Sequence, residues 1–226
     1  MTILVLAPHA DDEVLGVGGS IAKSAAAGER VVVAVMTGHG EEKHPLWPRE
    51  SWDSIRKECR AACDILGVSE LMFRELPAAC LDHVPVWKIN QVVADVVQEA
   101  KPDEIYVPFP HDLHQDHQAI SHAAVVALRP YLPLGRKVRR VLAYESLSGT
   151  HLAPPYLFPP FQPTVFVDIS EHLERKLEAM RAYRSQLQPD NQPRSIGGLR
   201  ALATLRGAHI GTSAAEAFVL LRETKL

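Results

Sequence analysis

The chain has 226 residues, of which 46% are hydrophobic, and its formal net charge is −3 at pH 7. This length can bury one sizeable core, so we expect a single domain over residues 1–226. The slightly acidic balance excludes nucleic acid as a general partner, because such binding needs a concentrated basic face. With neither a charged leader nor an apolar run of membrane-spanning length, we expect a cytoplasmic protein without an integral membrane segment.

Short apolar runs alternate with helical patterns along the whole chain. The predicted strands cover residues 3–7, 31–36, 71–73, 105–108, 138–144 and 166–168. The predicted helices cover residues 14–27, 56–66, 86–100, a segment that ends near 128, and 171–185 with Ser170 as N-cap. Loops are expected at 37–49, 77–85, 145–163 and 188–198, and residues 216–221 fit a strand or a short buried helix. The alternation predicts an α/β fold with a mostly parallel sheet.

The sequence contains partial matches to a dinucleotide-binding motif and to a cysteine-ligated zinc site, and neither match is complete. Gly16-Val17-Gly18-Gly19 falls short of a dinucleotide fingerprint, since Ile21 stands where the third glycine belongs. These glycines instead indicate a close approach of the first helix to the sheet or to a ligand. Cys59 and Cys63 are four residues apart on a predicted helix, which favours burial as small hydrophobes over a cysteine-ligated zinc.

Polar side chains follow the first predicted strand directly. His9, Asp11 and Asp12 lie between the apolar run 3–7 and the first helix. In α/β folds such a strand-to-helix turn exposes side chains at the carboxyl edge of the sheet. The alternative is that the acidic residues only cap the helix and interact favourably with its dipole.

A second turn of the same kind follows the strand 105–108. It contains His114, Asp116 and His117 just before another helix. Because the carboxyl ends of parallel strands share one edge of the sheet, we expect the two turns to meet there. A loop of this composition, taken alone, is also compatible with solvated histidines that have no function.

The joint occurrence of the two turns favours a metal site. A hydrolytic zinc takes three protein ligands from histidines and carboxylates and keeps one position open for water, and His9, Asp12 and His117 form such a set. Asp11 remains unliganded beside it and is the predicted general base. Mixed His and carboxylate ligation also accepts iron, cobalt or nickel.

Two further residues of the second turn have predicted catalytic roles. His114 is placed to donate a hydrogen bond to the oxygen that becomes negative in a tetrahedral intermediate. Asp116 is placed to hold a histidine in the correct tautomer.

The two motifs resemble those of a known family. Pro8-His9-Ala10-Asp11-Asp12-Glu13 looks like the (A/P)-H-(P/A)-D-D-E signature of the PIG-L/LmbE-like N-acetylglucosaminyl deacetylases, and His114-Gln115-Asp116-His117 looks like their H-x-D-H motif. The resemblance implies a three-layer Rossmann-like fold and removal of an N-acyl group from a small N-acetylated aminosugar substrate. It also implies zinc on His9, Asp12 and His117, with Asp11 as the base. Some members have a tyrosine where Asp112 stands, so no role of that tyrosine transfers.

Substrate contacts and assembly are less constrained by the motifs. Arg56 and Asp82 are the candidates for binding sugar hydroxyls, although an ion pair with a nearby Glu explains Arg56 equally well. The apolar residues in the Pro-rich loop 145–163 favour a homo-oligomer. The remaining functional alternatives are a two-metal phosphoesterase and a non-catalytic carbohydrate-binding relative.

Overall fold

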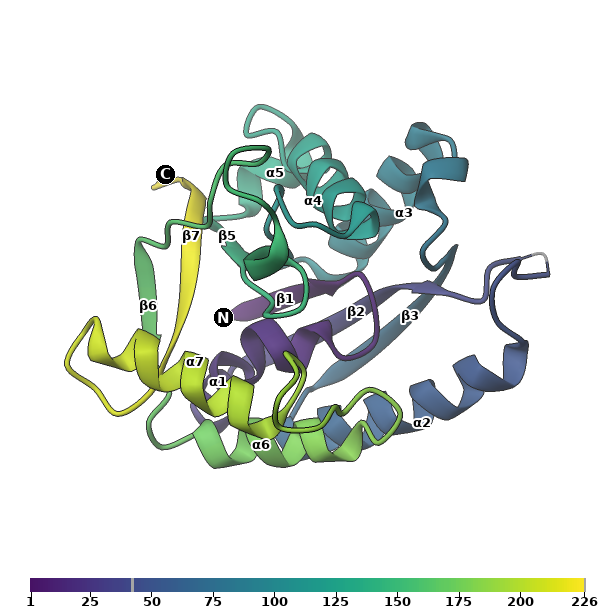
Figure 1. Cartoon of the computed structure of the whole chain (residues 1–226). Coiled ribbons are helices and arrows are strands. Elements are labelled where there is room, and N and C mark those ends of the chain that lie inside the picture. The colour runs from purple at the N-terminus through teal and green to yellow at the C-terminus, as the bar shows by residue number, and fades with distance from the viewer. Residues whose placement is uncertain (42, 226) are drawn as a thin grey trace.

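The computed structural model describes residues 1–41 and 43–225; residue 42, inside the predicted loop 37–49, and residue 226 lie outside this description. Within it, one sheet has the strand order β3-β2-β1-β4-β5-β7-β6 (Figure 1). The strands are β1 (Thr2–Ala7), β2 (Arg30–Gly38), β3 (Glu70–Pro77), β4 (Glu104–Pro108), β5 (Arg140–Tyr144), β6 (Val165–Asp168) and β7 (Ala215–Glu223).

The first five strands are parallel. β1 pairs with β2 on one side and with β4 on the other, while β3 adds to β2 and β5 to β4. β7 runs antiparallel to both β5 and β6. The predicted mostly parallel sheet is therefore confirmed, and the segments that follow β1 and β4 leave it at the same edge.

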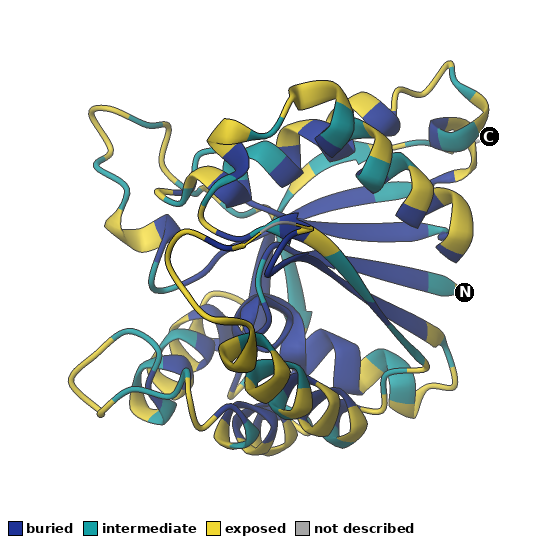
Figure 2. Ribbon diagram, turned by 90° about the vertical axis from the view of Figure 1, so that its right-hand side faces the viewer, coloured by how far each residue is buried: buried dark blue, intermediate teal, exposed yellow. Residues whose placement is uncertain are grey.

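Helices cover both faces of the sheet and make three layers. Side chains alternate along β1, so that Ile3 and Val5 join the core on one face while Leu4 and Leu6 join the core on the other. The central strands β1, β2, β4 and β5 are almost entirely buried and drawn dark blue, whereas the outer helix surfaces are exposed (Figure 2). In Figure 1 the lower layer holds α1 (Asp12–Ala26), α2 (Arg49–Leu66), α6 (Leu173–Ala182) and α7 (Ile196–Ala208), and the upper layer holds α3 (Val86–Ala100), α4 (Gln115–Ala127) and α5 (Pro133–Lys137).

Short 3-10 turns, η1 (Leu81–His83) and η2 (Thr150–Leu152), interrupt two of the predicted loops. Among the described residues, no helix combines the length and apolar character that a bilayer span requires. The predicted close approach of the first helix is found at Gly16, where a Cβ would overlap the ring of Tyr144 on β5.

Several predicted boundaries are wrong for identifiable reasons. α2 begins at Arg49 and not at residue 56. The prediction missed this start because the first two turns hold mostly polar residues and lack the apolar periodicity that marks the rest of the helix. Ser170 does not cap α6; its hydroxyl donates to the Asp168 carboxylate at 2.6 Å, and the helix starts after His172. The predicted loop 188–198 ends in α7, whose glycines lower its helix propensity. For residues 216–221, where the sequence left a strand and a short helix open, the structure shows the strand.

A buried ion pair joins three elements beneath the site. The Lys176 ammonium on α6 donates to Glu216 Oε1 on β7 at 2.6 Å and to the Leu15 carbonyl of α1 at 3.0 Å. The Glu216 carboxylate also accepts the backbone N–H groups of Gly19 and Ser20. Because Lys176 and Glu216 are both almost fully buried, removing one partner leaves an uncompensated charge.

We predict that Lys176→Met lowers the free energy of unfolding by about 3–5 kcal/mol, the usual consequence of breaking a buried pair. Urea denaturation followed by circular dichroism measures the change. Arg200→Met is the matched control, since Arg200 pairs with Glu174 on an exposed surface and its loss should change stability little. Equal destabilisation by both variants would contradict the prediction.

Candidate active site

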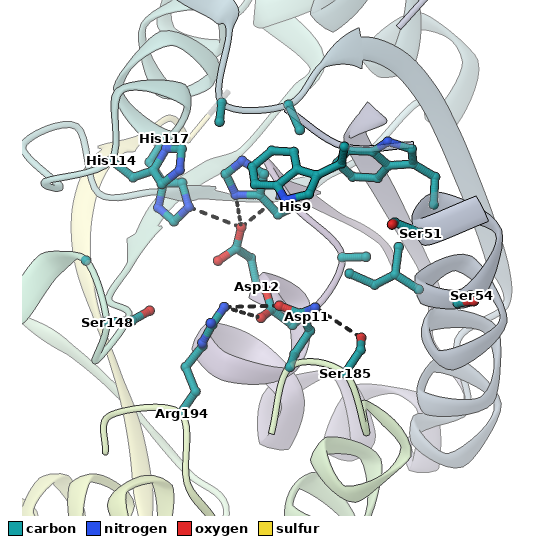
Figure 3. Close-up of a pocket in the computed structure, with 18 of the residues that line it drawn as sticks. His9, Asp11, Asp12, Ser51, Ser54, His114, His117, Ser148, Ser185 and Arg194 are labelled. Atoms are coloured by element: carbon teal, nitrogen blue, oxygen red, sulfur yellow. Dashed lines mark hydrogen bonds and ion pairs between the residues drawn. The ribbon is translucent and has the colours of Figure 1, made fainter. Parts of the chain in front are cut away.

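The two polar turns meet at the carboxyl edge of the sheet, as predicted. His9 follows β1, and His114 and His117 follow β4, the parallel neighbour of β1. Figure 3 shows the three rings facing one another. Each ring offers one nitrogen, and these atoms lie within 4.8 Å of one another.

The Asp12 carboxylate lies between two of these histidines. Its Oδ2 atom is 3.3 Å from Nδ1 of His9 and 3.2 Å from Nε2 of His117. The same oxygen accepts the backbone N–H of His9 at 2.9 Å. Two imidazole nitrogens and one carboxylate oxygen that converge in this way form a donor set that fits a divalent transition metal.

A second carboxylate fixes the ring of His9. Asp116 Oδ2 lies 2.9 Å from Nε2 of His9, and Asp116 is itself held by the backbone N–H groups of Ala79 and Leu81. Because Nε2 of His9 is directed at Asp116, Nδ1 is the nitrogen of this ring that faces Asp12. This geometry agrees with the prediction that Asp116 orients a histidine.

Asp112 has the corresponding place beside His117, although no role was predicted for it from the sequence. Its Oδ1 atom lies 3.5 Å from Nδ1 of His117. The buried carboxylate also accepts the backbone N–H of His114 at 2.8 Å and the Thr150 hydroxyl at 2.7 Å. Its contact with a ring five residues later arises only from the turn into α4, so sequence spacing alone does not indicate it.

The two histidines of this cluster bind protons strongly, whereas Asp12 stays ionised. Burial lowers the pKa of His9, but hydrogen bonds to Asp116 and Asp12 outweigh it and raise the pKa to about 9. Burial likewise lowers the pKa of His117, and Asp12 and Asp112 raise it to about 10. Burial opposes ionisation of Asp12, yet the neighbouring His117 and His9 hold its pKa far below its usual range. Since protons and metal cations compete for the same lone pairs, this cluster is suited to a cation.

Asp11 pairs with an arginine from a distant part of the chain. Its Oδ2 atom lies 3.3 Å from Nη1 of Arg194, and its side chain makes no capping hydrogen bond to α1. Burial and the nearby Asp12 carboxylate raise the pKa of Asp11 to about 8, while Arg194 opposes the rise. The helix-cap alternative therefore fails for Asp11, and a free buried carboxylate stands beside the three-ligand set.

Glu13 supports the unusual backbone of Asp11. The φ of Asp11 is 124°, a conformation that residues other than glycine rarely adopt. Glu13 Oε2 accepts the N–H of Asp11 at 3.1 Å, and the Tyr183 hydroxyl donates to Glu13 Oε1. Burial raises the pKa of Glu13 to about 7 despite these bonds. Glu13 therefore supports the turn through these hydrogen bonds.

Two cysteines lie close to Glu13. Cys59, Cys63 and Glu13 each have a ligand atom within 4.8 Å of the others, and all three are buried. A hydrogen bond to Cys59, together with burial, raises the pKa of the Cys63 thiol well above its usual value. Protonated buried thiols behave as small hydrophobes, which is the role expected from the sequence.

His114 is the N-cap residue of α4. Its Nδ1 atom accepts the backbone N–H of Asp116 at 3.2 Å, which leaves the proton of the neutral ring on Nε2. Burial, followed by the charges of His9 and His117, lowers the pKa of His114. A neutral ring that donates from Nε2 suits the predicted oxyanion contact, whereas metal ligation through Nε2 would require loss of that proton.

A cavity of about 800 Å³ opens in front of the cluster. Its other walls come from the segment before α2, from α2 itself, and from the loops that follow β3, β4, β5 and α6. The side chains there that were not predicted from the sequence are Trp47, Ser51, Trp52, Ser54, Ile55, Leu113, Ser148, Ser185, Gln186 and Arg194. They belong to four separate segments, so no local motif could have marked them.

The two predicted substrate contacts are not among the residues that line this cavity. Arg56 pairs with Glu75 on β3 at 2.5 Å, as the ion-pair alternative proposed, and its guanidinium lies over the Phe73 ring. Asp82 in η1 is exposed and lies 3.5 Å from His83. Among the described residues, Arg194 is the guanidinium that the structure does place in the cavity.

Known proteins with similar sequences are deacetylases by name. The sequence profile of the family described as "PIG-L: GlcNAc-PI de-N-acetylase" matches residues 4–128. The chain is 30% identical over 192 residues to "Probable N-acetyl-alpha-D-glucosaminyl L-malate deacetylase 2" of Bacillus cereus, covering 82% of this chain and 84% of that protein. It is 27% identical over 225 residues to diacetylchitobiose deacetylase of Thermococcus kodakarensis, with 95% and 80% covered.

A solved structure extends the likeness over the whole fold. A conserved protein from Thermus thermophilus, TT1542, superposes with a TM-score of 0.77 at 26% identity, covering 99% of this chain and 96% of that chain. The chain therefore belongs to the PIG-L family and is an enzyme of the N-deacetylase type. The resemblance seen in the two motifs is confirmed, and with it the three-layer Rossmann-like fold.

We predict that Tyr183→Phe lowers the free energy of unfolding by about 1.5–3 kcal/mol, because the buried Glu13 carboxylate loses a hydrogen bond. Thermal and urea unfolding measure the loss. Tyr156→Phe is the matched control, since Tyr156 is exposed and should tolerate the change. If both variants were as stable as the parent protein, the hydrogen bond from Tyr183 to Glu13 would not contribute to stability, and the prediction would be wrong.

Proposed function

We propose that this protein hydrolyses the N-acyl group, in the first instance N-acetyl, of an aminosugar of the N-acetylglucosamine type. The observation that carries the proposal is the position of Asp12 within 3.3 Å of both His9 Nδ1 and His117 Nε2, with the Asp11 carboxylate unliganded beside them. The names of the relatives from Bacillus cereus and Thermococcus kodakarensis support this substrate class.

The proposed metal ligands are His9, Asp12 and His117. A set of two imidazoles and a carboxylate suits zinc and also accepts iron, cobalt or nickel. When bound, such an ion supplies a Lewis acid for the amide carbonyl and lowers the pKa of a water. Asp116 is hydrogen-bonded to the His9 ring, an arrangement that raises the basicity of a histidine ligand, and Asp112 lies 3.5 Å from Nδ1 of His117.

The remaining steps belong to side chains of this chain. Asp11 takes the proton of the attacking water, and Arg194 beside it keeps the carboxylate in place. His114 donates its Nε2 proton as a hydrogen bond to the oxygen that gains negative charge. Asp11 then returns the proton to the departing amine, so that a carboxylate and a free aminosugar are the products.

The alternatives have less support from the described residues. A two-metal phosphoesterase needs carboxylates for a second ion about 3.5–4 Å away, but Asp112 and Asp116 are engaged with backbone groups and ring nitrogens. A non-catalytic relative would be expected to lack a ligand or the base, and all of them are present.

The direct test is release of free amine from N-acetylated aminosugars. We predict turnover of at least one N-acetylglucosamine derivative, loss of turnover when a chelator removes the metal, and recovery when zinc is added back. Metal analysis should find one ion per chain. Two ions per chain together with phosphatase activity would favour the phosphoesterase.

We predict that Asp11→Asn keeps the metal but lowers kcat by about 10²–10⁴-fold, the range typical of general-base loss. His117→Ala should lose both metal and turnover, because it removes a ligand. Metal content and amine release are measured on the same samples. Full turnover of Asp11→Asn would disprove the assignment of the base.

A further inference from the structure

The cavity has a closed end and an open end. At the closed end, Asp11, Asp12 and His117 are almost fully buried. At the open end, Trp47 and Leu113 line the same cavity but are 44% and 45% exposed. The small reacting amide belongs beside the buried cluster, so the larger remainder of a substrate must extend toward the exposed apolar side chains.

Two tryptophans form one wall of this open end. Trp47 precedes α2 and Trp52 lies in its first turn, and their ring centroids are 6.0 Å apart with the planes nearly perpendicular. Ser51 and Ser54, on the same helix, stand opposite the histidine cluster in Figure 3. The wall therefore offers flat aromatic faces next to hydroxyl groups.

The position of Trp47 is fixed although its ring is exposed. The buried His44 ring stacks on Trp47 with centroids 5.3 Å apart and planes inclined by 29°. His44 Nδ1 accepts the backbone N–H groups of Leu46 and Trp47, and His44 Nε2 lies 2.9 Å from the Ala78 carbonyl. A large aromatic group that is held in place and left in contact with solvent marks a binding surface.

Trp52 packs its ring against Trp47 and lines the same cavity. A ligand that brings a flat apolar surface fits this aromatic pair, and ether or hydroxyl oxygens on the ligand suit the neighbouring Ser51 and Ser54.

We propose that Trp47 and Trp52 form a subsite for the aglycone of the substrate, and that this aglycone presents a flat apolar face. The inference rests on the proposed function, because the aminosugar amide sets the position of the aglycone. Glycosides with an aromatic aglycone should therefore be better substrates than those with a small alkyl group. The rival occupant is a long N-acyl chain, which predicts a different selectivity.

The kinetic test compares phenyl and methyl glycosides of N-acetylglucosamine, in both anomers, by amine release. The parent enzyme should prefer the phenyl glycoside of at least one anomer, and Trp47→Ala should reduce this ratio of kcat/KM values about tenfold, the range expected for loss of an aromatic contact. Trp87→Ala is the matched control, because Trp87 is 71% exposed at the start of α3 and is not among the cavity-lining residues. Its ratio should equal that of the parent enzyme.

A binding test needs no turnover. The chain has three tryptophans, so in Trp87→Phe all tryptophan emission comes from Trp47 and Trp52. Titration of this metal-loaded variant with phenyl glucosaminide, which is already deacylated, should change the emission in a saturable way. Methyl glucosaminide at the same concentrations should have a much weaker effect.

The outcomes separate the subsite from the proposed function. Equal rates for phenyl and methyl glycosides, or a preference that survives Trp47→Ala, would disprove the subsite while deacylation itself stands. A Trp47→Ala effect that follows N-acyl length and not the aglycone would also overturn it in favour of the rival occupant. If no glycoside is deacylated, the proposed function fails, and the emission titration alone supports or refutes the aromatic subsite.

Discussion

The structure of the site depends on one buried carboxylate. Asp12 is almost fully removed from water between two imidazole rings, and a lone anion there would be strongly unfavourable. It is tolerated because β1 and β4 are adjacent parallel strands, which bring His9 and His117 to the same point from distant segments of the chain. The topology of the sheet therefore determines which charged groups surround Asp12, and these charges determine which ligands the site can bind.

Each side chain around Asp12 is in turn held by backbone from another part of the fold. Asp116 reaches the residues before and within η1, while Asp112 contacts Thr150 in η2. Two loops that the sequence analysis predicted without assigning them a role thus hold the Asp116 and Asp112 carboxylates in place beside the histidines. A ring whose far nitrogen is already committed has one orientation left, so the site is organised before any ligand arrives.

The sequence predicted the parallel core and the meeting of the two turns because buried strands and His/Asp motifs are local patterns. It also predicted the position of Asp116 behind a histidine. It did not predict contacts that depend on the tertiary fold. Arg194 meets Asp11 from the segment between α6 and α7, and Trp47 reaches the cavity from the segment before α2, so no local pattern indicates either contact.

The position of Arg194 shows that the site is built from two separate parts of the chain. The matched family profile ends at residue 128, whereas Arg194 and Tyr183, which touch Asp11 and Glu13, come from the last quarter of the chain. Both signature motifs thus lie within the first 128 residues, whereas part of the electrostatic setting of Asp11 and Glu13 comes from beyond residue 180. A change at Arg194 or Tyr183 can therefore alter the surroundings of these two carboxyl groups while both motifs stay unchanged.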